Sequence, residues 1–255
     1  MSLLIDADYT VYKNCAAAET EIDFGEDVIV VTSKFSEALD KVRRDLFSIA
    51  TDLGCFDDSI LFFSDSVNFR KTIDPSYKGH RNRKKPCGYK RVINALKEEF
   101  PVVVMPTLEA DDAIGIYATK EPGHIICSPD KDMRQISCNL FDLTEGIVEI
   151  TKEEGDRWHL IQTMAGDQTD GYAGIPGIGI KRAEALLDEH GATWQTVVDA
   201  FAAKDLDESV ALLNARLAKI LQVDDYDFTN QEPILWSPSS SDGPNDGAAV
   251  QAPSD

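Results

Sequence analysis

The stretch Ser59–Asp65, SILFFSD, is a run of mostly apolar residues that ends in an aspartate. A continuous apolar run of about four to eight residues is typical of a strand buried on both faces of a sheet. Two more runs have this form: LLID at 3–6, and HIIC at 124–127, which Ser-Pro-Asp follows. The three stretches predict strands of one sheet, each of which ends in or leads to an acidic residue.

The segments between these strands have helical periodicity. One apolar face follows a 4-3-4-3-4 spacing through Phe35, Leu39, Val42, Leu46, Ile49 and Leu53. Further helices are expected from near Leu108 and Lys152, and further strands at 102–105 and 139–143. Strands that alternate with helices predict an α/β fold with a mostly parallel central sheet flanked by helices.

The chain changes character near residue 152. Strand patterns fade there, and helices are expected at 152–166, 180–190, 193–203 and 207–222. We therefore predict an α/β core at 1–151 and a helical region at 152–236. The remainder, 237–255, is rich in Ser, Pro, Gly and Asp and predicts a disordered tail.

The bulk composition restricts the class of protein. The 255 residues contain 25 Lys and Arg against 45 Asp and Glu, a net charge of −20, which a protein that coats DNA would not have. The five cysteines form no CxxC pair, which indicates neither a disulfide framework nor a zinc cluster. The N-terminus lacks a basic leader, and no apolar run approaches the roughly 18 residues of a membrane span. We expect a soluble, cytoplasmic protein with no membrane contact.

Acidic residues gather where the predicted strands end. In an open α/β sheet, ligands bind outside the carboxyl ends of the strands. Carboxylates that converge there repel one another unless cations neutralise them, and Mg²⁺ prefers oxygen ligands. One such aspartate would be read as a loop cap, but four separate acidic sites predict a centre for two Mg²⁺ ions, with Mn²⁺ able to substitute. The candidate ligands are Asp6, Asp65, Glu109, Asp111, Asp130, Asp132, Asp167 and Asp170, with Asp112 adjacent. Asp167 and Asp170 are expected to share one helical face.

A different reading starts from Asp6-Ala7-Asp8-Tyr9-Thr10. This DxDxT pattern resembles that of haloacid-dehalogenase-like phosphatases, in which Asp6 would be the nucleophile and Asp8 its acid/base partner. The reading leaves Asp65, Glu109 and the later aspartates without a role, so the metal centre is favoured.

The segment 70–91 has the opposite charge to the rest of the chain. It contains nine Lys or Arg residues and one acidic residue, a local charge of +8. Two interleaved tyrosines offer rings on which bases could stack. A solvated loop is the plain alternative, but a basic loop that begins just after Asp65 would hang over the acidic cluster and bind a polyanion in a salt-sensitive way. The candidate DNA contacts are Arg70, Tyr77, Arg83, Lys84 and Lys85.

The turn GIPGIG at 174–179, with Lys181 and Arg182 after it, resembles a helix-hairpin-helix motif at about 171–190. Glycines allow a tight turn and a close approach of phosphate to the backbone, and the N-terminus of the following helix attracts anions. We expect Gly177, Gly179, Lys181 and Arg182 to contact DNA by shape and not by sequence. The alternative is an ordinary corner between two helices.

Taken together, the motifs LIDAD, FFSDSVNFRK, YKGHR, LEADD, SPDKD and GDQTDGYAGIPGIG resemble, in this order, the 5′-nuclease (flap-endonuclease-like) family. The similarity is greatest to the small stand-alone 5′→3′ exonucleases of tailed, podovirus-type bacteriophages. It implies a PIN/5′-nuclease-like fold with two metal sites. One resembles Asp6, Asp65, Glu109 and Asp111, and the other Asp130, Asp132, Asp167 and Asp170.

The resemblance also implies a helical arch at about 70–98 over the metals, with Lys78 and Arg81 as catalytic contacts to the scissile phosphate. A K⁺ ion at the glycine turn is a further implication. The activity implied is Mg²⁺-dependent 5′→3′ hydrolysis of duplex DNA from 5′ ends, extending to the RNA of RNA–DNA hybrids, in phage DNA replication and recombination. A structure-specific 5′-flap endonuclease and a catalytically silent DNA-junction-binding protein are the alternatives. The short segment after Lys78 leaves open whether the arch closes.

Overall fold

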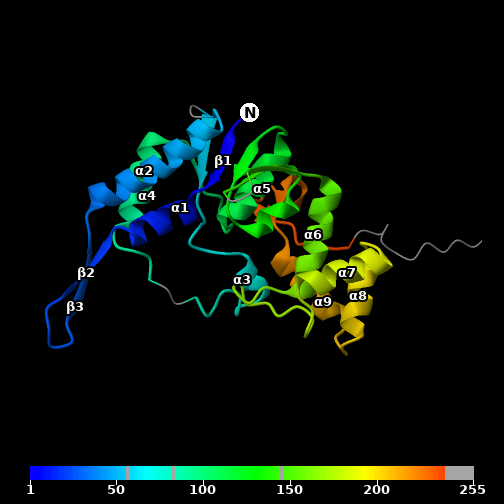
Figure 1. Cartoon of the computed structure of the whole chain (residues 1–255). Coiled ribbons are helices and arrows are strands. Elements are labelled where there is room, and N and C mark those ends of the chain that lie inside the picture. The colour runs from blue at the N-terminus through cyan, green and yellow to red at the C-terminus, as the bar shows by residue number, and fades with distance from the viewer. Residues whose placement is uncertain (56–57, 82–83, 144–145, 239–255) are drawn as a thin grey trace, which may run out of the picture.

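The computed structural model describes residues 1–55, 58–81, 84–143 and 146–238, and its centre is a six-stranded sheet (Figure 1). The strand order is β5-β4-β1-β6-β7-β8, and all pairs are parallel except the β7–β8 pair. The strands are β1 (Leu3–Asp6), β4 (Ser59–Phe62), β5 (Val102–Val103), β6 (Ile125–Cys127), β7 (Cys138–Asp142) and β8 (Gly146–Ile150). The predicted, mostly parallel sheet is confirmed, although its antiparallel edge strand β8 was not expected.

Helices cover both faces of the sheet, because successive side chains of a strand point to opposite faces. Leu3 and Ile5 pack under α1 (Ala7–Ala16), α2 (Phe35–Asp52) and α4 (Tyr89–Glu99). Leu4 packs on the other face, against α5 (Ala110–Lys120) and the 3₁₀ helix η2 (Lys131–Gln135). These two buried clusters confirm the expected α/β class.

Four more helices follow the sheet and share a core of their own, which contains Leu160, Leu187, Phe201 and Ala215. They are α6 (Lys152–Ala165), α7 (Ile180–His190), α8 (Trp194–Ala202) and α9 (Glu208–Ala218). The Thr151 hydroxyl accepts the Glu154 N–H and so caps the start of α6. The separate core supports our proposal of a boundary near residue 151.

After α9 the chain returns to the sheet and forms η3 (Val223–Asp225), β9 (Tyr226–Asp227) and β10 (Glu232–Pro233). The predicted disordered tail, 237–255, falls outside the described residues from 239 onward. None of the helices in the described part of the chain has the length and apolar character that crossing a membrane requires.

The segment predicted as an arch, 70–98, divides into two parts. The short helix α3 (Arg70–Ile73) and the turns after it run below the sheet toward α4 (Figure 1). Helix α4 instead belongs to the covering layer, because Tyr89, Val92 and Leu96 are buried against α1 and α2. One face of α4 thus packs on the body, and the extent of the arch to residue 98 stays a prediction.

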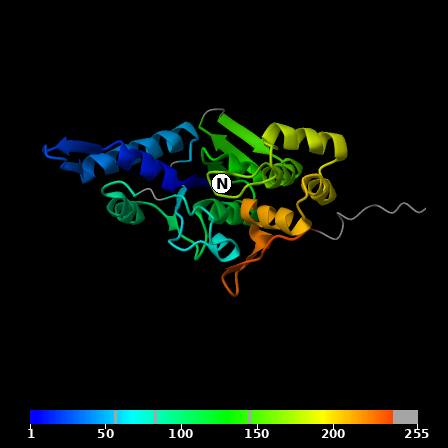
Figure 2. The same ribbon diagram turned by 90° about the horizontal axis from the view of Figure 1, so that it is seen from below.

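An antiparallel hairpin that the sequence did not predict joins α1 to α2. It consists of β2 (Glu19–Asp23) and β3 (Ile29–Ser33). The hairpin projects from the body beyond the end of α1, on the side away from α7 to α9 (Figures 1 and 2).

Candidate functional site

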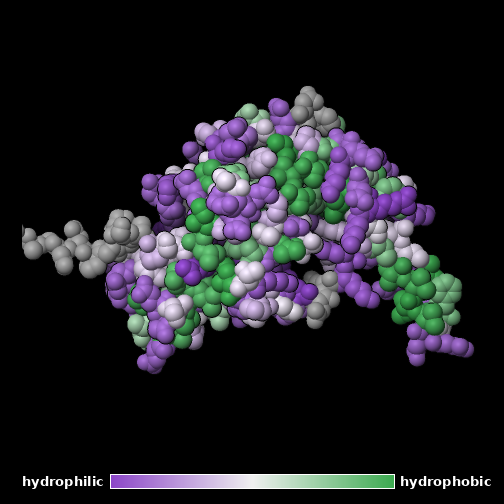
Figure 3. Space-filling model, turned by 180° about the vertical axis from the view of Figure 1, so that it is seen from behind, coloured by the Kyte–Doolittle hydropathy of each residue, from purple (hydrophilic) through white to green (hydrophobic). Residues whose placement is uncertain are grey.

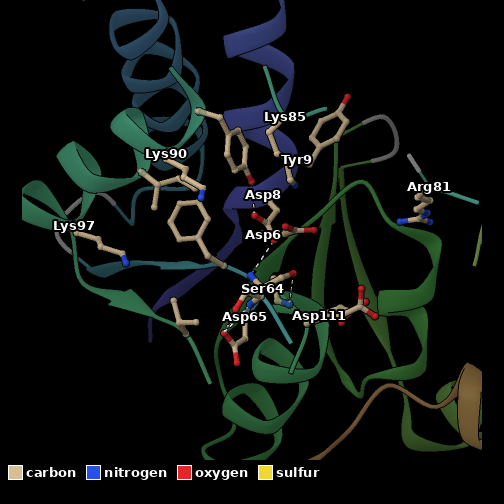
Figure 4. A pocket seen from close by; sticks show the side chains of 17 residues that line it. Asp6, Asp8, Tyr9, Ser64, Asp65, Arg81, Lys85, Lys90, Lys97 and Asp111 are labelled. Carbon is tan, nitrogen blue, oxygen red and sulfur yellow. Dashed lines mark hydrogen bonds between the residues drawn. The ribbon is translucent and has the colours of Figure 1, made fainter. Parts of the chain in front are cut away.

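Four acidic side chains from the strand ends and from the start of α5 line one cavity of about 620 Å³ (Figure 4). Asp6 is the last residue of β1, Asp65 follows β4, and Glu109 and Asp111 lie at the N-terminal end of α5. We call these four residues the strand-end group. Figure 4 shows Asp6, Asp65 and Asp111 gathered around Ser64. The parallel register brings them together, since β1 pairs directly with β4.

The environments of these carboxylates differ. Asp6 Oδ1 is buried and finds no hydrogen-bond donor among the described residues. Burial, together with the nearby carboxylates Asp8 and Asp130, raises the pKa of Asp6 to about 7. Burial also raises the pKa of Asp111, whereas hydrogen bonds from the backbone of Thr107 and Ser66 lower the pKa of Asp65.

Four further aspartates lie on turns beside the sheet, and we call them the turn group. Asp130 caps η2, where its Oδ1 accepts the Asp132 N–H at 2.9 Å. Asp167 and Asp170 were expected on a helix, but α6 ends at Ala165 and both lie in the turn that follows. Asp167 Oδ1 organises this turn by accepting the N–H groups of Thr169 at 2.7 Å and Asp170 at 3.3 Å. The two side chains therefore come together by turn geometry, and the prediction of a helical face is wrong.

Three residues of the basic segment join the two groups. The Tyr77 hydroxyl lies 3.0 Å from Glu109 Oε2 and 2.9 Å from Asp170 Oδ2. Lys78 Nζ lies 2.6 Å from Glu109 Oε1 and 3.5 Å from Asp170 Oδ2. Arg81 adds a contact of 2.6 Å to Asp170. The strand-end group and the turn group thus face each other across the side chains of one short segment.

Lys78 is fixed by its backbone as well as by its charge. Its φ of 53° is in the left-handed region, and its N–H donates to the Asp170 carbonyl at 2.7 Å. Burial by itself would lower the pKa of Lys78, but the carboxylates Glu109, Asp111 and Asp170 raise it. In turn, Lys78 and Arg70 overcome the effect of burial and lower the pKa of Glu109 to about 2. The ammonium group of Lys78 is held charged at the point where the two groups meet.

Arg70 was predicted to contact DNA, and this is wrong. Its side chain is only 1% exposed, and it grips the Asp112 carboxylate with two hydrogen bonds of 2.6 and 2.8 Å. Asp112 is completely buried and also accepts the Leu221 N–H at 3.1 Å. The ligand atoms of Glu109, Asp111 and Asp112 lie within 4.8 Å of one another, yet Asp112 is already bound on both oxygens. Asp112 is thus the partner of Arg70, and its predicted role as a metal ligand stays a prediction.

Tyr77 is also corrected, since it is 2% exposed and cannot stack on a base. Lys84 and Lys85 are exposed as predicted for DNA contacts, and Lys85 Nζ lies 4.6 Å from the centre of the Tyr89 ring. Lys85, Lys90 and Lys97 line the acidic cavity from the α4 side (Figure 4). The predicted contact Arg83 lies outside the described residues.

Two buried glutamines complete the site, and sequence reasoning missed both. Gln162 on α6 donates to Asp132 Oδ1 at 2.5 Å, and its carbonyl accepts the Gln135 amide at 2.7 Å. Gln135 donates as well to the Ala218 carbonyl and accepts the Ile220 N–H. On the other side, Arg70 donates to the carbonyls of Leu217 and Lys219.

The end of α9 and the residues that follow it, 217–221, are therefore held by partners of both groups. Carbonyls at a helix C-terminus lack intrahelical donors, so these side chains satisfy them while they orient Asp112 and Asp132. The only sequence signal for the glutamines was their closeness to predicted ligands, since Gln135 lies three residues after Asp132 and Gln162 five residues before Asp167.

Comparison with known sequences supports the family that these features suggest. A family model for the 5′-3′ exonuclease, N-terminal resolvase-like domain, matches residues 1–160. The chain is 31% identical to the exodeoxyribonuclease of Enterobacteria phage T3, with 93% of each protein covered. It is 30% identical to the exonuclease of Escherichia phage T7, with 92% of this chain and 93% of that protein covered. The chain belongs to the 5′-3′ exonuclease family.

The fold of this nuclease agrees with that assignment. It matches the T5 D15 protein co-crystallised with metal ions with a TM-score of 0.63 at 16% identity, over 86% of this chain and 89% of that one. Flap endonuclease-1 from Methanococcus jannaschii matches with a TM-score of 0.54 at 16% identity, over 93% and 82%. The predicted resemblance to phage 5′-nucleases is confirmed.

The phosphatase reading of Asp6 and Asp8 does not hold for this nuclease. Asp8 Oδ1 accepts the Tyr89 hydroxyl at 2.6 Å, and its Oδ2 accepts the Ser64 N–H at 2.9 Å. Both oxygens of Asp8 therefore fasten α4 and the end of β4, which leaves neither for proton transfer to a substrate.

The glycine turn of the nuclease lies between α6 and α7. Gly174 has a φ of 62°, and a Cβ there would meet Gly166 N at 2.4 Å, so both glycines are required where the chain passes itself. Gly177 and Gly179 are exposed, as are Lys181 and Arg182. Arg182 reaches back to the Gly177 carbonyl at 2.7 Å.

The donor set fits divalent cations. All eight residues of the two groups offer carboxylate oxygen, the ligand that hard cations such as Mg²⁺ prefer. The buried, unpaired Asp6 Oδ1 and the raised pKa values of Asp6, Asp111 and Asp132 show that negative charge is undercompensated at this point. Divalent cations bound there would supply the missing positive charge.

Proposed function

We propose that this nuclease is a Mg²⁺-dependent 5′→3′ exonuclease that hydrolyses duplex DNA from its 5′ ends and also removes RNA from RNA–DNA hybrids. The observation that carries the proposal is the meeting of the two carboxylate groups at Tyr77 and Lys78, two residues of the basic segment. The exonucleases of phages T3 and T7, to which the chain is similar along almost its whole length, support the same activity. Mn²⁺ is proposed as a substitute for Mg²⁺.

In this proposal, Asp6, Asp65, Glu109 and Asp111 hold one cation, and Asp130, Asp132, Asp167 and Asp170 hold the other. Bound divalent cations would lower the pKa of an attacking water and stabilise the charge that develops on the leaving oxygen. Tyr77 keeps Glu109 and Asp170 at a fixed separation through its hydroxyl. The protein thereby sets the distance between the two halves of the site before DNA arrives.

Lys78 and Arg81 are proposed as the groups that contact the scissile phosphate. Both now bind carboxylates, and Arg81 is 43% exposed in its side chain. When cations neutralise Glu109 and Asp170, these side chains lose part of their attraction to the carboxylates and become available to a phosphate. Lys84, Lys85 and the other cations of the cavity wall would guide the same strand toward the site.

We further propose that the turn at 174–179 acts as a helix-hairpin-helix that holds the duplex. Its exposed glycines let phosphates approach the backbone, and the first turn of α7 offers N–H groups without helical partners. A K⁺ ion bound by carbonyls of the turn is part of this proposal. Because Arg182 already binds the Gly177 carbonyl, K⁺ would have to compete with that guanidinium.

The activity is tested with 5′-labelled blunt duplex, a 5′-flap substrate and an RNA–DNA hybrid, each with Mg²⁺ or EDTA. Mononucleotides released from the blunt duplex are expected, and a single cut at the base of the flap would instead favour the flap-endonuclease alternative. Asp130→Asn and Asp167→Asn are expected to abolish cleavage while DNA binding is retained. Asp199→Asn, an exposed carboxylate on α8, is the matched control and should cleave normally.

Full cleavage in EDTA, or full cleavage by the Asp130→Asn enzyme, would contradict the two-metal proposal. Binding of duplex by the wild type without any product would revive the silent junction-binding alternative, against which family membership argues.

A further inference from the structure

The β2–β3 hairpin has one face without charge. Paired residues of an antiparallel hairpin point to the same face, and the pairing sets Ile22 opposite Val30 and Thr20 opposite Thr32. Beyond them, the Phe24 N–H donates to the Val28 carbonyl at 2.9 Å and extends the same face. The four apolar members are strongly exposed: Ile22 41%, Phe24 67%, Val28 51% and Val30 40%. The hairpin therefore presents a ladder of apolar side chains to solvent, visible as the projecting hydrophobic lobe in Figure 3.

The opposite face is acidic along β2 only, because its β3 half is formed by Ile29 and Val31, which are 61% and 42% exposed, and the tip is acidic as well. Glu19, Glu21 and Asp23 form a row along β2, and Glu26 and Asp27 lie in the connecting turn. Residues 19–33 contain no Lys, Arg or His at all. The hairpin thus combines an apolar face with an acidic rim.

Such a hairpin is unfavourable in a free protein, because it has little packing to stabilise it and it exposes apolar side chains to water. A lone two-stranded hairpin is at best marginally stable in water, and exposed contiguous apolar side chains mark interaction sites. Neither face of this hairpin packs on the sheet or on a helix, since every residue from Thr20 to Val31 is exposed. Binding of another molecule would stabilise the hairpin and remove its apolar side chains from water.

The charge of the rim selects the kind of partner. Phosphates of DNA would be repelled by the five carboxylates, whereas Lys and Arg side chains would pair with them. Two copies of the hairpin paired edge to edge along β2 would place their acidic rows side by side, which like-charge repulsion disfavours. We propose that the β2–β3 hairpin is a docking surface for a basic, amphipathic strand of another protein that adds along the edge of β2. Its apolar side chains would extend the row of Ile22 and Phe24, and its basic side chains would lie beside Glu21 and Asp23 on the opposite face.

The hairpin is tied at its base to the DNA-binding part of the nuclease. Glu19 Oε1 accepts the Cys87 N–H at 2.7 Å, and Cys87 follows Lys84 and Lys85. A partner on the hairpin would therefore sit beside the basic segment without covering the carboxylate groups. This position suits a protein that already occupies DNA and recruits the nuclease to it.

The probe for a test is a synthetic peptide of 14 alternating Lys and Val residues that carries a fluorophore, compared with a peptide in which Glu replaces Lys. Anisotropy titrations with the full-length nuclease are expected to show binding of the Lys/Val peptide only. The double variant Phe24→Ser/Val30→Ser and the double variant Glu21→Gln/Asp23→Asn should each weaken it at least tenfold. Cleavage of duplex DNA should stay unchanged in both.

Matched controls change the same residue types elsewhere on the surface. They are Ile147→Ser/Ile234→Ser for the apolar pair and Glu98→Gln/Glu153→Gln for the acidic pair, all of them exposed or partly exposed. Hydrogen exchange locates the site independently, because the hairpin amides should exchange fast in the free protein and slow on peptide binding.

Equal affinity in hairpin and control variants, or protection outside residues 19–33, would overturn the proposal. So would a loss of duplex DNA affinity in the Phe24→Ser/Val30→Ser variant, which would assign the face to nucleic acid. Self-association that the same variant abolishes would assign it to a second copy of the chain.

Discussion

The two carboxylate groups carry the same chemistry on different supports. The strand-end group lies on β1, β4 and α5, and the guanidinium that supports it, Arg70, is 1% exposed. The turn group lies on η2 and on the turn after α6, and its cations Lys131 and Arg81 are 46% and 43% exposed. A cation beside a carboxylate can therefore serve the fold or the substrate, and its burial determines which of the two it serves. A buried cation is needed for stability, and an exposed one is free to change partners.

The largest effect is expected on the buried side. Arg70→Met leaves Asp112 as a buried carboxylate without its partner, which typically costs about 3–5 kcal/mol of unfolding free energy. The carbonyls of Leu217 and Lys219 lose their donor at the same time. Urea denaturation followed by circular dichroism measures the loss. The double variant Arg70→Met/Asp112→Asn should recover part of it, because the unpaired charge is gone. A loss below about 1 kcal/mol for Arg70→Met would contradict the structural role assigned to Arg70.

The next largest effect is expected on the Mg²⁺ affinity of the turn group alone. Gln162→Leu removes the amide that orients Asp132, and loss of a residue that orients a metal ligand typically weakens binding about 10–100-fold. Calorimetric titration with Mg²⁺ should show one weakened site and one unchanged site. Gln195→Leu, on the exposed face of α8, is the control. Equal weakening of both sites would show that the groups are not supported separately.

The two groups were also unequally predictable from the sequence. SILFFSD and LLID place Asp65 and Asp6 at the carboxyl ends of adjacent parallel strands, and that inference needs only strand periodicity. Asp167 and Asp170 were predicted as ligands by motif but given helical geometry, because a spacing of three suits a helix and a tight turn alike. Residue spacing by itself therefore cannot distinguish a helix from a tight turn.

The burial of Arg70 and Tyr77 was beyond sequence reasoning for a related reason. A basic segment predicts exposure on average, yet the partner of Arg70 is 42 residues away at Asp112, and the partners of Tyr77 lie on α5 and the turn after α6. Such pairs are set by tertiary packing. The β2–β3 hairpin was missed because its exposed apolar ladder has no counterpart in a core.

The pH dependence of metal binding tests both groups together. The pKa of Asp6 and of Asp132 is about 7 in the folded protein, against 3.8 for an ordinary aspartate. The folded state therefore binds more protons than the unfolded state, and without metal the unfolding free energy should fall as pH rises from about 4 to about 7. Metal must displace these protons, so Mg²⁺ affinity should rise about tenfold per group between pH 6 and pH 8. Calorimetry at both pH values measures this rise.

The Asp6→Asn variant provides the check for the pH series. One proton fewer has to leave, so the rise at the strand-end group should shrink by about a factor of ten while that at the turn group persists. A pH-independent affinity in the wild type would show that neither carboxyl is protonated near neutral pH in the folded protein.

The smallest effect is expected on the exposed side of the comparison. Lys131 Nζ lies 2.7 Å from Asp167 and 4.0 Å from Asp132, with its side chain 46% exposed. Solvent screens such a pair, so Lys131→Ala should change the unfolding free energy by no more than about 1 kcal/mol, measured by urea denaturation beside Arg70→Met. Without the ammonium group, however, the turn group should bind Mg²⁺ more tightly, because the cation no longer competes with Lys131 for Asp167. A loss of stability as large as that of Arg70→Met would mean that exposure does not distinguish the roles of Lys131 and Arg70.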